Sequence, residues 1–207
     1  MKRKTLWQRF FYEFVRWFGG ALAIVFLRLN RRGVDEWPDP ELGGLVCSNH
    51  QTFMDPVLVG LAYPGRMNYL ARQSLFDIPV LRFLMASLDA TPIQREGMGI
   101  GGIKETLRRL KRKELVLMFP EGTRTVNGDL QEFKPGFLAL VRRSKVPVIP
   151  VAIDGAFASW PRDRRLPRPA KVTVTVCPPI LAQDYATMND DELLSELRSR
   201  IAGGLGS

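Results

Sequence analysis

Residues 45–56, LVCSNHQTFMDP, join a short apolar strand to an apolar helix. The strand is predicted over 45–48 and the helix over 57–63, because both runs are rich in apolar residues. Pro56 suits the first position of a helix and biases Asp55 away from helical backbone, so the helix is expected to start at or after Pro56. The polar residues between the two elements therefore form a strand-to-helix corner, where catalytic groups commonly sit in α/β proteins.

This corner contains the single histidine of the chain, His50, five residues ahead of Asp55. Histidine can accept and return a proton near neutral pH, and a neighbouring carboxylate can hold its ring in one tautomer and stabilise the imidazolium. Positions five apart on a regular helix are separated by about 140°, so a turn has to fold Asp55 back toward His50. With that turn the pair is a general-base unit. The alternative is a surface or core histidine without a chemical role.

A second strand, predicted over 115–119, is followed by PEGTR, residues 120–124. Proline ends the strand, and Gly122 permits a tight turn or a close backbone approach. Arg124 carries a rigid fork of donors suited to phosphate oxygens and stands near Glu121 at the end of the strand. The segment predicts either an anion-binding corner or a surface turn with a Glu121–Arg124 ion pair.

Strands and helices alternate around these two segments. The pattern predicts an α/β fold with a single mixed sheet flanked by helices, formed by residues 33–207. Two cysteines, Cys47 and Cys177, fall in predicted strands and are expected to be buried thiols, which argues against Cys47 as a nucleophile beside His50. The strands are expected at 45–48, 67–71, 90–93, 115–119, 147–153 and 171–177, and the helices at 57–63, 75–87, 100–113, 136–144 and 190–202.

The N-terminal segment, residues 1–32, carries eight Lys or Arg and one Glu, a charge of +7 out of +9 for the chain. A basic excess confined to one end suggests an anionic membrane surface rather than nucleic acid. Its aromatic residues share one face of a helical pattern, which is typical of a helix in the membrane interface. The residues expected to bind the membrane are Trp7, Phe10, Phe11, Phe14, Trp17 and Phe18.

The uncharged run 17–27 of this segment is about half the length of a bilayer span. We therefore expect an in-plane or re-entrant attachment that precedes the α/β domain. Charges at Arg9, Glu13 and Arg16 interrupt the apolar region that a signal peptide requires. A helix packed on its own domain or on a partner subunit is the alternative.

The two motifs together resemble the glycerolipid acyltransferase family, which includes lysophosphatidic acid acyltransferases. The family signature is N-H-x-x-x-x-D followed by F-P-E-G-T-R, and both are intact here, with His50 and Glu121 separated by 71 positions. Similar blocks follow the family order at 70–76, 78–81, 93–95, 133–136 and 146–151. The resemblance covers roughly residues 40 to 155 and is far more specific than one short motif.

The resemblance implies transfer of an acyl group from an acyl thioester, of acyl carrier protein or CoA, to the hydroxyl of 1-acylglycerol 3-phosphate. It implies His50 and Asp55 as the catalytic pair, with no metal and no cofactor. It also implies membrane lipid as a partner and a peripheral or monotopic place on the cytoplasmic face of the cytoplasmic membrane. The residues implied to bind the acceptor and its phosphate are Arg72, Arg95, Glu121, Gly122, Thr123 and Arg124.

Two rival functions remain open. One is the same chemistry on another lysolipid, for example an ornithine-derived one, because Arg82, Asp89 and Pro92 depart from the family pattern near the implied acceptor site. The other is a catalytically silent scaffold that binds anionic membranes. The basic helix over 100–113 is either a docking patch for an acidic acyl carrier or, as we expect, a solvated face.

Overall fold

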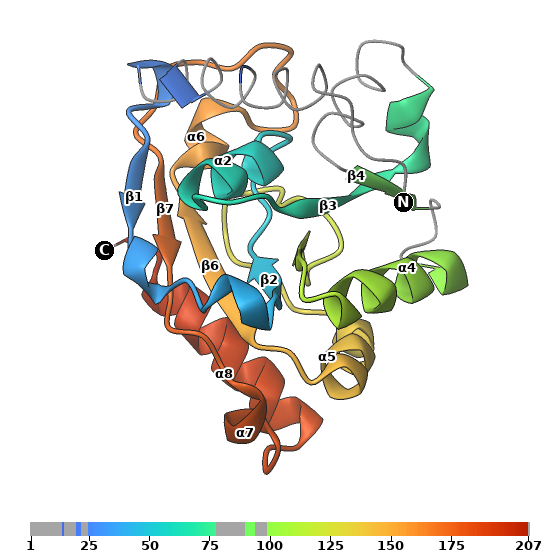
Figure 1. The fold of residues 1–207 in the computed structure, drawn as a ribbon. Coiled ribbons are helices and arrows are strands. Elements are labelled where there is room, and N and C mark those ends of the chain that lie inside the picture. The colour runs from blue at the N-terminus through green and yellow to red at the C-terminus, as the bar shows by residue number, and fades with distance from the viewer. Residues whose placement is uncertain (1–13, 15–19, 22–24, 78–89, 94–98, 207) are drawn as a thin grey trace.

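The computed structural model describes residues 14, 20–21, 25–77, 90–93 and 99–206. Its strands form one seven-stranded sheet in the order β1-β7-β6-β2-β5-β3-β4 (Figure 1). Neighbouring strands are parallel except for β6 and β7, which are antiparallel. The single mixed sheet predicted from the sequence is therefore confirmed. The strands are β1 Asn30–Arg32, β2 Gly44–Ser48, β3 Asn68–Arg72, β4 Ala90–Ile93, β5 Leu115–Met118, β6 Val148–Asp154 and β7 Thr173–Val176.

Helices cover the sheet where the sequence pattern expects them, with some short additions. The region predicted as a helix over 75–87 begins as a 3₁₀ turn, and most of it lies outside the described residues. Among the described helices, none combines the length and apolar character needed to cross a membrane. The α-helices are α2 Asp55–Ala62, α4 Gly99–Lys111, α5 Leu138–Ser144, α6 Ala156–Ser159, α7 Ala182–Tyr185 and α8 Asp190–Gly203, and the 3₁₀ helices are Val34–Glu36, Pro40–Leu42, Gln73–Phe76 and Pro135–Phe137.

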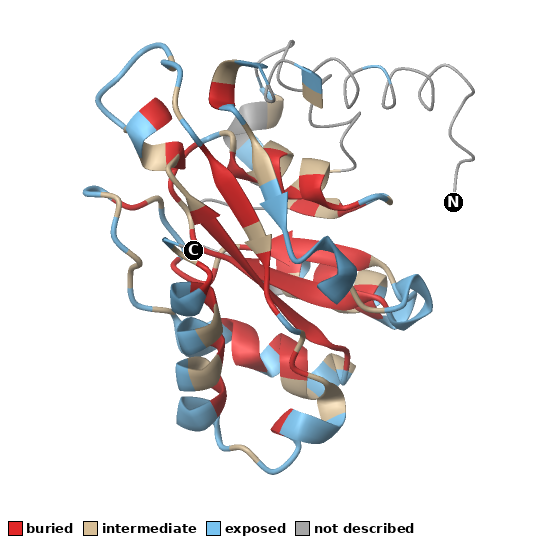
Figure 2. Ribbon diagram, turned by 90° about the vertical axis from the view of Figure 1, so that its left-hand side faces the viewer, coloured by how far each residue is buried: buried red, intermediate tan, exposed pale blue. Residues whose placement is uncertain are grey.

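The sheet separates two apolar cores (Figure 2). Along β2, Val46 contributes to the core beneath α2, while Leu45 and Cys47 contribute to the core beneath α4, α5 and α8. All three side chains are fully buried. Because helices cover both faces, the strand is a continuous apolar run from Leu45 to Cys47 rather than an alternating one, as is usual for central parallel strands.

Strand β1 was not predicted from the sequence, which places residues 30–32 in the N-terminal segment. The structure instead pairs Asn30–Arg32 in parallel with β7, at one edge of the sheet. Gly33 then turns the chain with φ 60°, and a Cβ there would lie 2.1 Å from the carbonyl oxygen of Val176. The strand is short, polar and largely exposed, so it lacks the apolar run that marks the other strands in the sequence.

The C-terminal helix α8 covers the core that lies beneath α4, α5 and α8. Its first turn has the expected capping box, in which Asn189 and Glu192 each accept the other's backbone amide. The helix ends in a close approach to the sheet: a Cβ on Gly204 would lie 2.7 Å from Cβ of Ala152, whereas nothing lies within 4 Å of one on Gly203. Glycine at 204 therefore lets the chain lie directly against β6.

Candidate active site

The two sequence motifs meet at one edge of the sheet. His50 follows β2 and Glu121 follows β5, and these neighbouring strands are parallel, with Cys47 opposite Met118. Parallel strands end at the same edge, so residues 71 positions apart in sequence become neighbours there. The position agrees with the general rule that α/β proteins carry their sites beyond the carboxyl ends of the strands.

His50 and Asp55 are joined directly. Nδ1 of His50 lies 2.8 Å from Oδ2 of Asp55, whose side chain is completely buried. One detail of the prediction is wrong: helix α2 begins at Asp55, one residue before Pro56. Proline is tolerated there because the amide it lacks would have no partner in the first turn of the helix.

Asp55 is held by the backbone that turns around it. Oδ2 also accepts the amides of Gln51, at 2.5 Å, and Thr52, at 2.8 Å, while Oδ1 accepts the hydroxyl of Thr52 at 2.7 Å. A carboxylate that receives this many donors acts as an acceptor toward His50. The proton of the neutral ring is therefore on Nδ1, and Nε2 carries the free lone pair.

The ring of His50 is fixed from other directions as well. It stacks on Phe119, the residue before the PEGTR turn, with 3.9 Å between ring centroids and 14° between planes. The backbone carbonyl of His50 accepts a hydrogen bond from the amide of Thr125 at 2.8 Å. The side chain remains 20% exposed, so the ring has a fixed orientation and is still open to a ligand.

Two residues next to His50 tie its segment to β6 and α6. The side chain of Asn49 donates to the carbonyl of Ile153 at 2.8 Å and accepts its amide at 2.7 Å, as a neighbouring strand would. Gln51 accepts the amide of Phe157 at 3.0 Å and donates to the carbonyl of Gly128. Sequence reasoning missed these two positioning residues, although their polar character beside a buried strand was a signal.

Glu121 is buried rather than part of a surface turn. Its side chain is 2% exposed, and Oε1 accepts the backbone amide of His50 at 3.3 Å. Oε2 is buried without a hydrogen-bond partner in the part of the chain that the structure describes. Burial raises the pKa of Glu121 to about 7, while the amides of His50 and Gln131 partly oppose the shift. The carboxyl group is thus poised to bind one more polar group.

The rest of the PEGTR turn borders this carboxyl group. Gly122 adopts the left-handed region with φ 69°, which favours glycine. Thr123 accepts a hydrogen bond from the guanidinium of Arg162 at 2.5 Å. The guanidinium of Arg124 lies over the ring of Phe53, 3.5 Å from its centroid, and Phe53 is 59% exposed. Arginine and aromatic side chains therefore line the outer part of the site.

Other predicted site residues are only partly described. Arg72 is the last residue of β3, and its side chain, like the whole of Arg95, lies outside what the structure describes. Of the six aromatic residues expected to bind the membrane, Phe14 is described, with 49% of its side chain exposed. Trp7, Phe10, Phe11, Trp17 and Phe18 lie outside the described residues.

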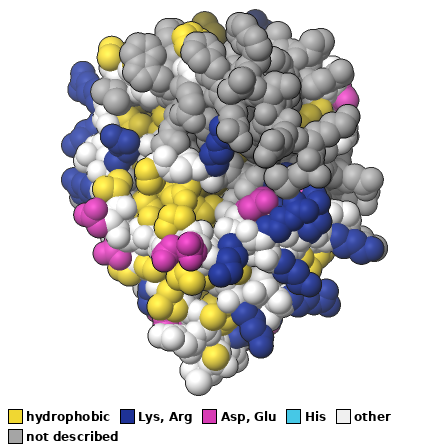
Figure 3. Space-filling view, viewed as in Figure 1, with side chains coloured by type: hydrophobic (Ala, Val, Ile, Leu, Met, Phe, Trp, Pro, Cys, Tyr) yellow, Lys and Arg dark blue, Asp and Glu magenta, His cyan; other side chains and the backbone are white. Residues whose placement is uncertain are grey.

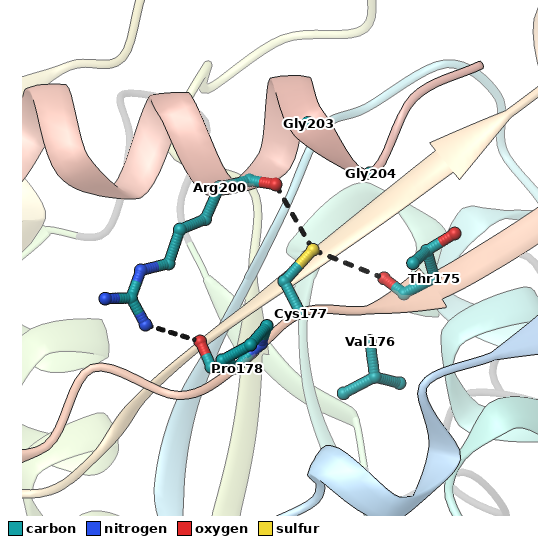
Figure 4. A pocket seen from close by; sticks show the side chains of 7 residues that line it. All are labelled: Thr175, Val176, Cys177, Pro178, Arg200, Gly203 and Gly204. Carbon is teal, nitrogen blue, oxygen red and sulfur yellow. Dashed lines mark hydrogen bonds between the residues drawn. The ribbon is translucent and has the colours of Figure 1, made fainter. Parts of the chain in front are cut away.

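Both cysteines are buried thiols, as expected from the sequence. Cys47 is completely buried, and burial raises the pKa of its thiol far above the ordinary range, so it is no nucleophile for His50. Cys177 lines a pocket of about 240 Å³ between β7 and α8, where its thiol donates to the carbonyl of Arg200 at 3.2 Å (Figure 4). None of the predicted site residues lines that pocket. No group of three or more potential metal ligands occurs among the described residues.

Lys and Arg side chains gather over α4 (Figure 3). Glu105 pairs within this helix with Arg108, at 2.7 Å, and Arg109, at 3.0 Å, and these contacts lower the pKa of Glu105. Lys104 and Lys111 are exposed. Internal pairing of this kind agrees with a solvated helix face, as expected from the sequence.

Comparison with known proteins agrees with the motifs. A family model described as "Acyltransferase" matches residues 11–154. The chain is 26% identical over 200 residues to the chloroplastic 1-acyl-sn-glycerol-3-phosphate acyltransferase LPAT1 of Arabidopsis thaliana, covering 95% of this chain and 54% of that protein. It is also 26% identical to the 1-acyl-sn-glycerol-3-phosphate acyltransferase of Bacillus subtilis, covering 75% of each. The chain thus spans about half the length of the plant relatives it matches.

The fold has a close counterpart among solved structures. The crystal structure of PlsC, a 1-acyl-sn-glycerophosphate acyltransferase from Thermotoga maritima, superposes with a TM-score of 0.81. The match covers 99% of this chain and 82% of that one, at 23% sequence identity. The α/β architecture with its single sheet is therefore shared with that enzyme.

Proposed function

The chain belongs to the acyltransferase family, and on that premise we propose that it transfers an acyl group from an acyl thioester to the free hydroxyl of 1-acylglycerol 3-phosphate. The product of this reaction is phosphatidic acid. The thioester is carried by acyl carrier protein or CoA. The relatives named as 1-acyl-sn-glycerol-3-phosphate acyltransferases support this choice of acceptor.

The hydrogen bond between His50 Nδ1 and Asp55 Oδ2 is the observation that carries the proposal. It fixes the ring so that Nε2 is the basic nitrogen, and the partly exposed ring can receive a substrate hydroxyl. Asp55, buried and held by Gln51 and Thr52, stabilises the imidazolium that forms. This is the arrangement that general-base catalysis requires.

In the proposed mechanism the acceptor hydroxyl donates a hydrogen bond to Nε2 of His50. The hydroxyl oxygen attacks the thioester carbonyl as the proton passes to Nε2, and a tetrahedral intermediate forms. When the intermediate collapses, the carbonyl group re-forms, the C–S bond breaks and the imidazolium of His50 gives its proton to the departing thiolate. His50 ends in its starting form, so the reaction needs no enzyme nucleophile, no metal and no cofactor.

The PEGTR turn is proposed to bind the acceptor. Oε2 of Glu121, buried and unpaired within the described structure, would bind a glycerol hydroxyl. Arg124 and Arg72 would bind the acceptor phosphate together with Arg95, since arginine matches phosphate oxygens with two donors at once. The left-handed turn at Gly122 would let the acceptor approach the backbone closely.

We place the protein on the cytoplasmic face of the cytoplasmic membrane, attached without spanning it. The +7 charge and the aromatic residues of 1–32 support this attachment. The attachment would bring the catalytic edge to the lysolipid and keep the product in the bilayer.

The proposal is tested by thioester-dependent acylation of 1-acylglycerol 3-phosphate, with mass spectrometry of the product. His50→Ala should lower kcat by about 10²–10⁴-fold, the usual loss for a positioned general base. Circular dichroism of the variant serves as the control for folding. Near-normal turnover by folded His50→Ala protein would exclude the mechanism.

The rival functions give different results in the same assay. A panel of lysolipids with one acyl donor reveals a different acceptor, for example an ornithine-derived lysolipid, by its higher kcat/KM. A catalytically silent membrane scaffold would bind vesicles but would acylate none of the lysolipids in the panel. Arg124→Ala should raise KM for a phosphate-bearing acceptor much more than KM for the donor, by about 10–100-fold for a charge-assisted hydrogen bond.

A further inference from the structure

The loop between α6 and β7, residues 160–171, is a strongly basic, exposed segment of the described structure. Its sequence WPRDRRLPRPAK contains five basic residues and one acid. All six charged side chains of the loop are exposed. Leu166, in the middle of the loop, is 77% exposed and has a basic residue on either side within two positions. Single exposed leucines are common on protein surfaces, so it is the basic surroundings of Leu166 that distinguish it.

The loop has a defined shape because its backbone is bonded across its base. The amide of Arg168 donates to the carbonyl of Ser159 at 3.0 Å, and the hydroxyl of Ser159 donates back to the carbonyl of Arg168 at 2.8 Å. Nearer the tip, the indole of Trp160 donates to the carbonyl of Arg164 at 3.0 Å. These bonds hold the base of the loop closed and leave the side chains of Arg164, Arg165 and Leu166 exposed.

The loop lies at the same edge of the sheet as His50. Strand β6 ends at this edge and β7, which is antiparallel to it, begins there, so their connection crosses the edge (Figure 1). Direct contacts confirm the position: Arg162 donates to Thr123 of the PEGTR turn, and Trp160 lies edge-on to Phe53, with 6.1 Å between centroids. Two more exposed apolar side chains, Phe53 at 59% and Val126 at 69%, belong to the segments after β2 and β5.

The end of the N-terminal segment reaches the same edge. The carbonyl of Leu27 accepts the amide of Val172, just after the loop, and Val25 is 80% exposed. Four segments separate in sequence thus present exposed apolar side chains, with arginines among them, at the edge of the sheet that carries the candidate site. Arginine paired with exposed aliphatic and aromatic side chains suits a bilayer interface, in which cations meet lipid phosphates and apolar groups enter the acyl boundary.

We propose that residues 160–171 form a second membrane contact, carried by the α/β domain itself, in which Arg164 and Arg165 bind phosphates of an anionic bilayer and Leu166 enters its interface. The inference takes from the proposed function only the lipid nature of the acceptor. The contact would help to set the orientation of the catalytic edge toward the membrane.

The test is vesicle sedimentation of the full chain, with phosphatidylglycerol–phosphatidylcholine vesicles at a lipid concentration that binds half of the wild type. Arg164→Gln/Arg165→Gln should weaken binding roughly tenfold to thirtyfold at low salt, and the difference should shrink at high salt. Leu166→Ser should weaken binding roughly tenfold at both salt concentrations, because apolar insertion is not screened. Both variants leave the loop's backbone bonds in place.

The matched control is Lys111→Gln/Arg143→Gln, which removes the same charge from positions at the ends of α4 and α5. These ends precede β5 and β6 and so lie at the opposite edge of the sheet. Equal binding by the loop and control variants would overturn the proposal. So would a loop variant that binds vesicles normally but has a raised KM for acyl carrier protein thioester, since the loop would then dock an acidic protein.

Turnover on a short-chain, monomeric acceptor keeps this test apart from that of the proposed function. Loop variants should retain it within about twofold of the wild type, because the substitutions do not touch His50 or the PEGTR turn. Absent turnover in all forms, with the predicted vesicle pattern, would refute the reaction and leave the membrane contact intact.

Discussion

Replacing Asp55 with asparagine separates the charge of this residue from its role in holding His50. From sequence alone the exchange is expected to mis-set the tautomer of the ring, which costs about 10⁴-fold in catalytic triads. The structure changes this expectation. Oδ2 of Asp55 receives three N–H groups, from the ring of His50 and the amides of Gln51 and Thr52. An amide NH₂ group at this position would face three donors, so the amide oxygen has to stay there.

The NH₂ group of the introduced asparagine therefore takes the place of Oδ1, beside the hydroxyl of Thr52. That hydroxyl can rotate and accept a hydrogen bond, although it already accepts the amide of Met54. The tautomer of His50 is preserved, and only the negative charge is lost. A hydrogen bond to a charged group is worth about 1.5–3 kcal/mol and a neutral one about 1 kcal/mol. The expected loss in kcat is therefore roughly 2- to 30-fold.

The assay combines steady-state acyl transfer with ¹⁵N NMR of the single histidine ring. Asp55→Asn should keep the proton of the neutral ring on Nδ1 and keep the melting temperature within a few degrees of the wild type. Asp55→Ala is the contrasting variant, since it leaves the buried amides of Gln51 and Thr52 without an acceptor, at about 1–3 kcal/mol each. A loss of about 10⁴-fold in Asp55→Asn with the proton moved to Nε2 would refute the reasoning.

Buried groups elsewhere give three more tests. The pKa of Glu121 is about 4.5 in the unfolded chain and about 7 in the folded protein, so the folded state binds the proton more tightly. The free energy of unfolding should therefore fall by up to about 3 kcal/mol from pH 4.5 to 7. Chemical denaturation at several pH values measures this fall, and Glu121→Gln should show a flatter pH profile. Asn49→Ala leaves the buried amide and carbonyl of Ile153 unpaired, so its melting temperature should fall by roughly 5–20 °C, and no fall would contradict the bridge. Gly204→Ala should cost about 1–3 kcal/mol by overpacking while Gly203→Ala is neutral or slightly stabilising, and equal effects would disprove the close contact.

The sequence predicted the fold where the pattern is long and apolar. Strands such as β2 and β5 have buried apolar runs bounded by polar turns. Because the two strands are parallel, their carboxyl ends lie at the same edge of the sheet. Strand β1 and helices α6 and α7 are only three or four residues long, so neither periodicity nor an apolar run marks them. The start of α2 was misplaced because Pro56 restrains Asp55 only weakly against four hydrogen bonds to its side chain.

The candidate site was predicted in part for a similar reason. The pairing of His50 with Asp55 is local and was expected from five residues of spacing. The burial of Glu121 and the bridge from Asn49 to Ile153 depend on which strands become neighbours, which single-sequence patterns do not specify. The roles of Arg72, Arg95, Thr123 and Arg124 toward a substrate remain predictions.

The bonds around His50 also bear on the order in which the protein folds. The residues that hold its segment are 71 to 106 positions away along the chain, at Glu121, Ile153 and Phe157. Contacts of such separation require large loops to close before they return any stabilisation, whereas the helical contacts of α8 are local. Refolding should therefore restore helical circular dichroism well before catalysis. Chains that end before β6 would lack Ile153 and Phe157, the partners of Asn49 and Gln51, so the segment around His50 should not reach its final conformation.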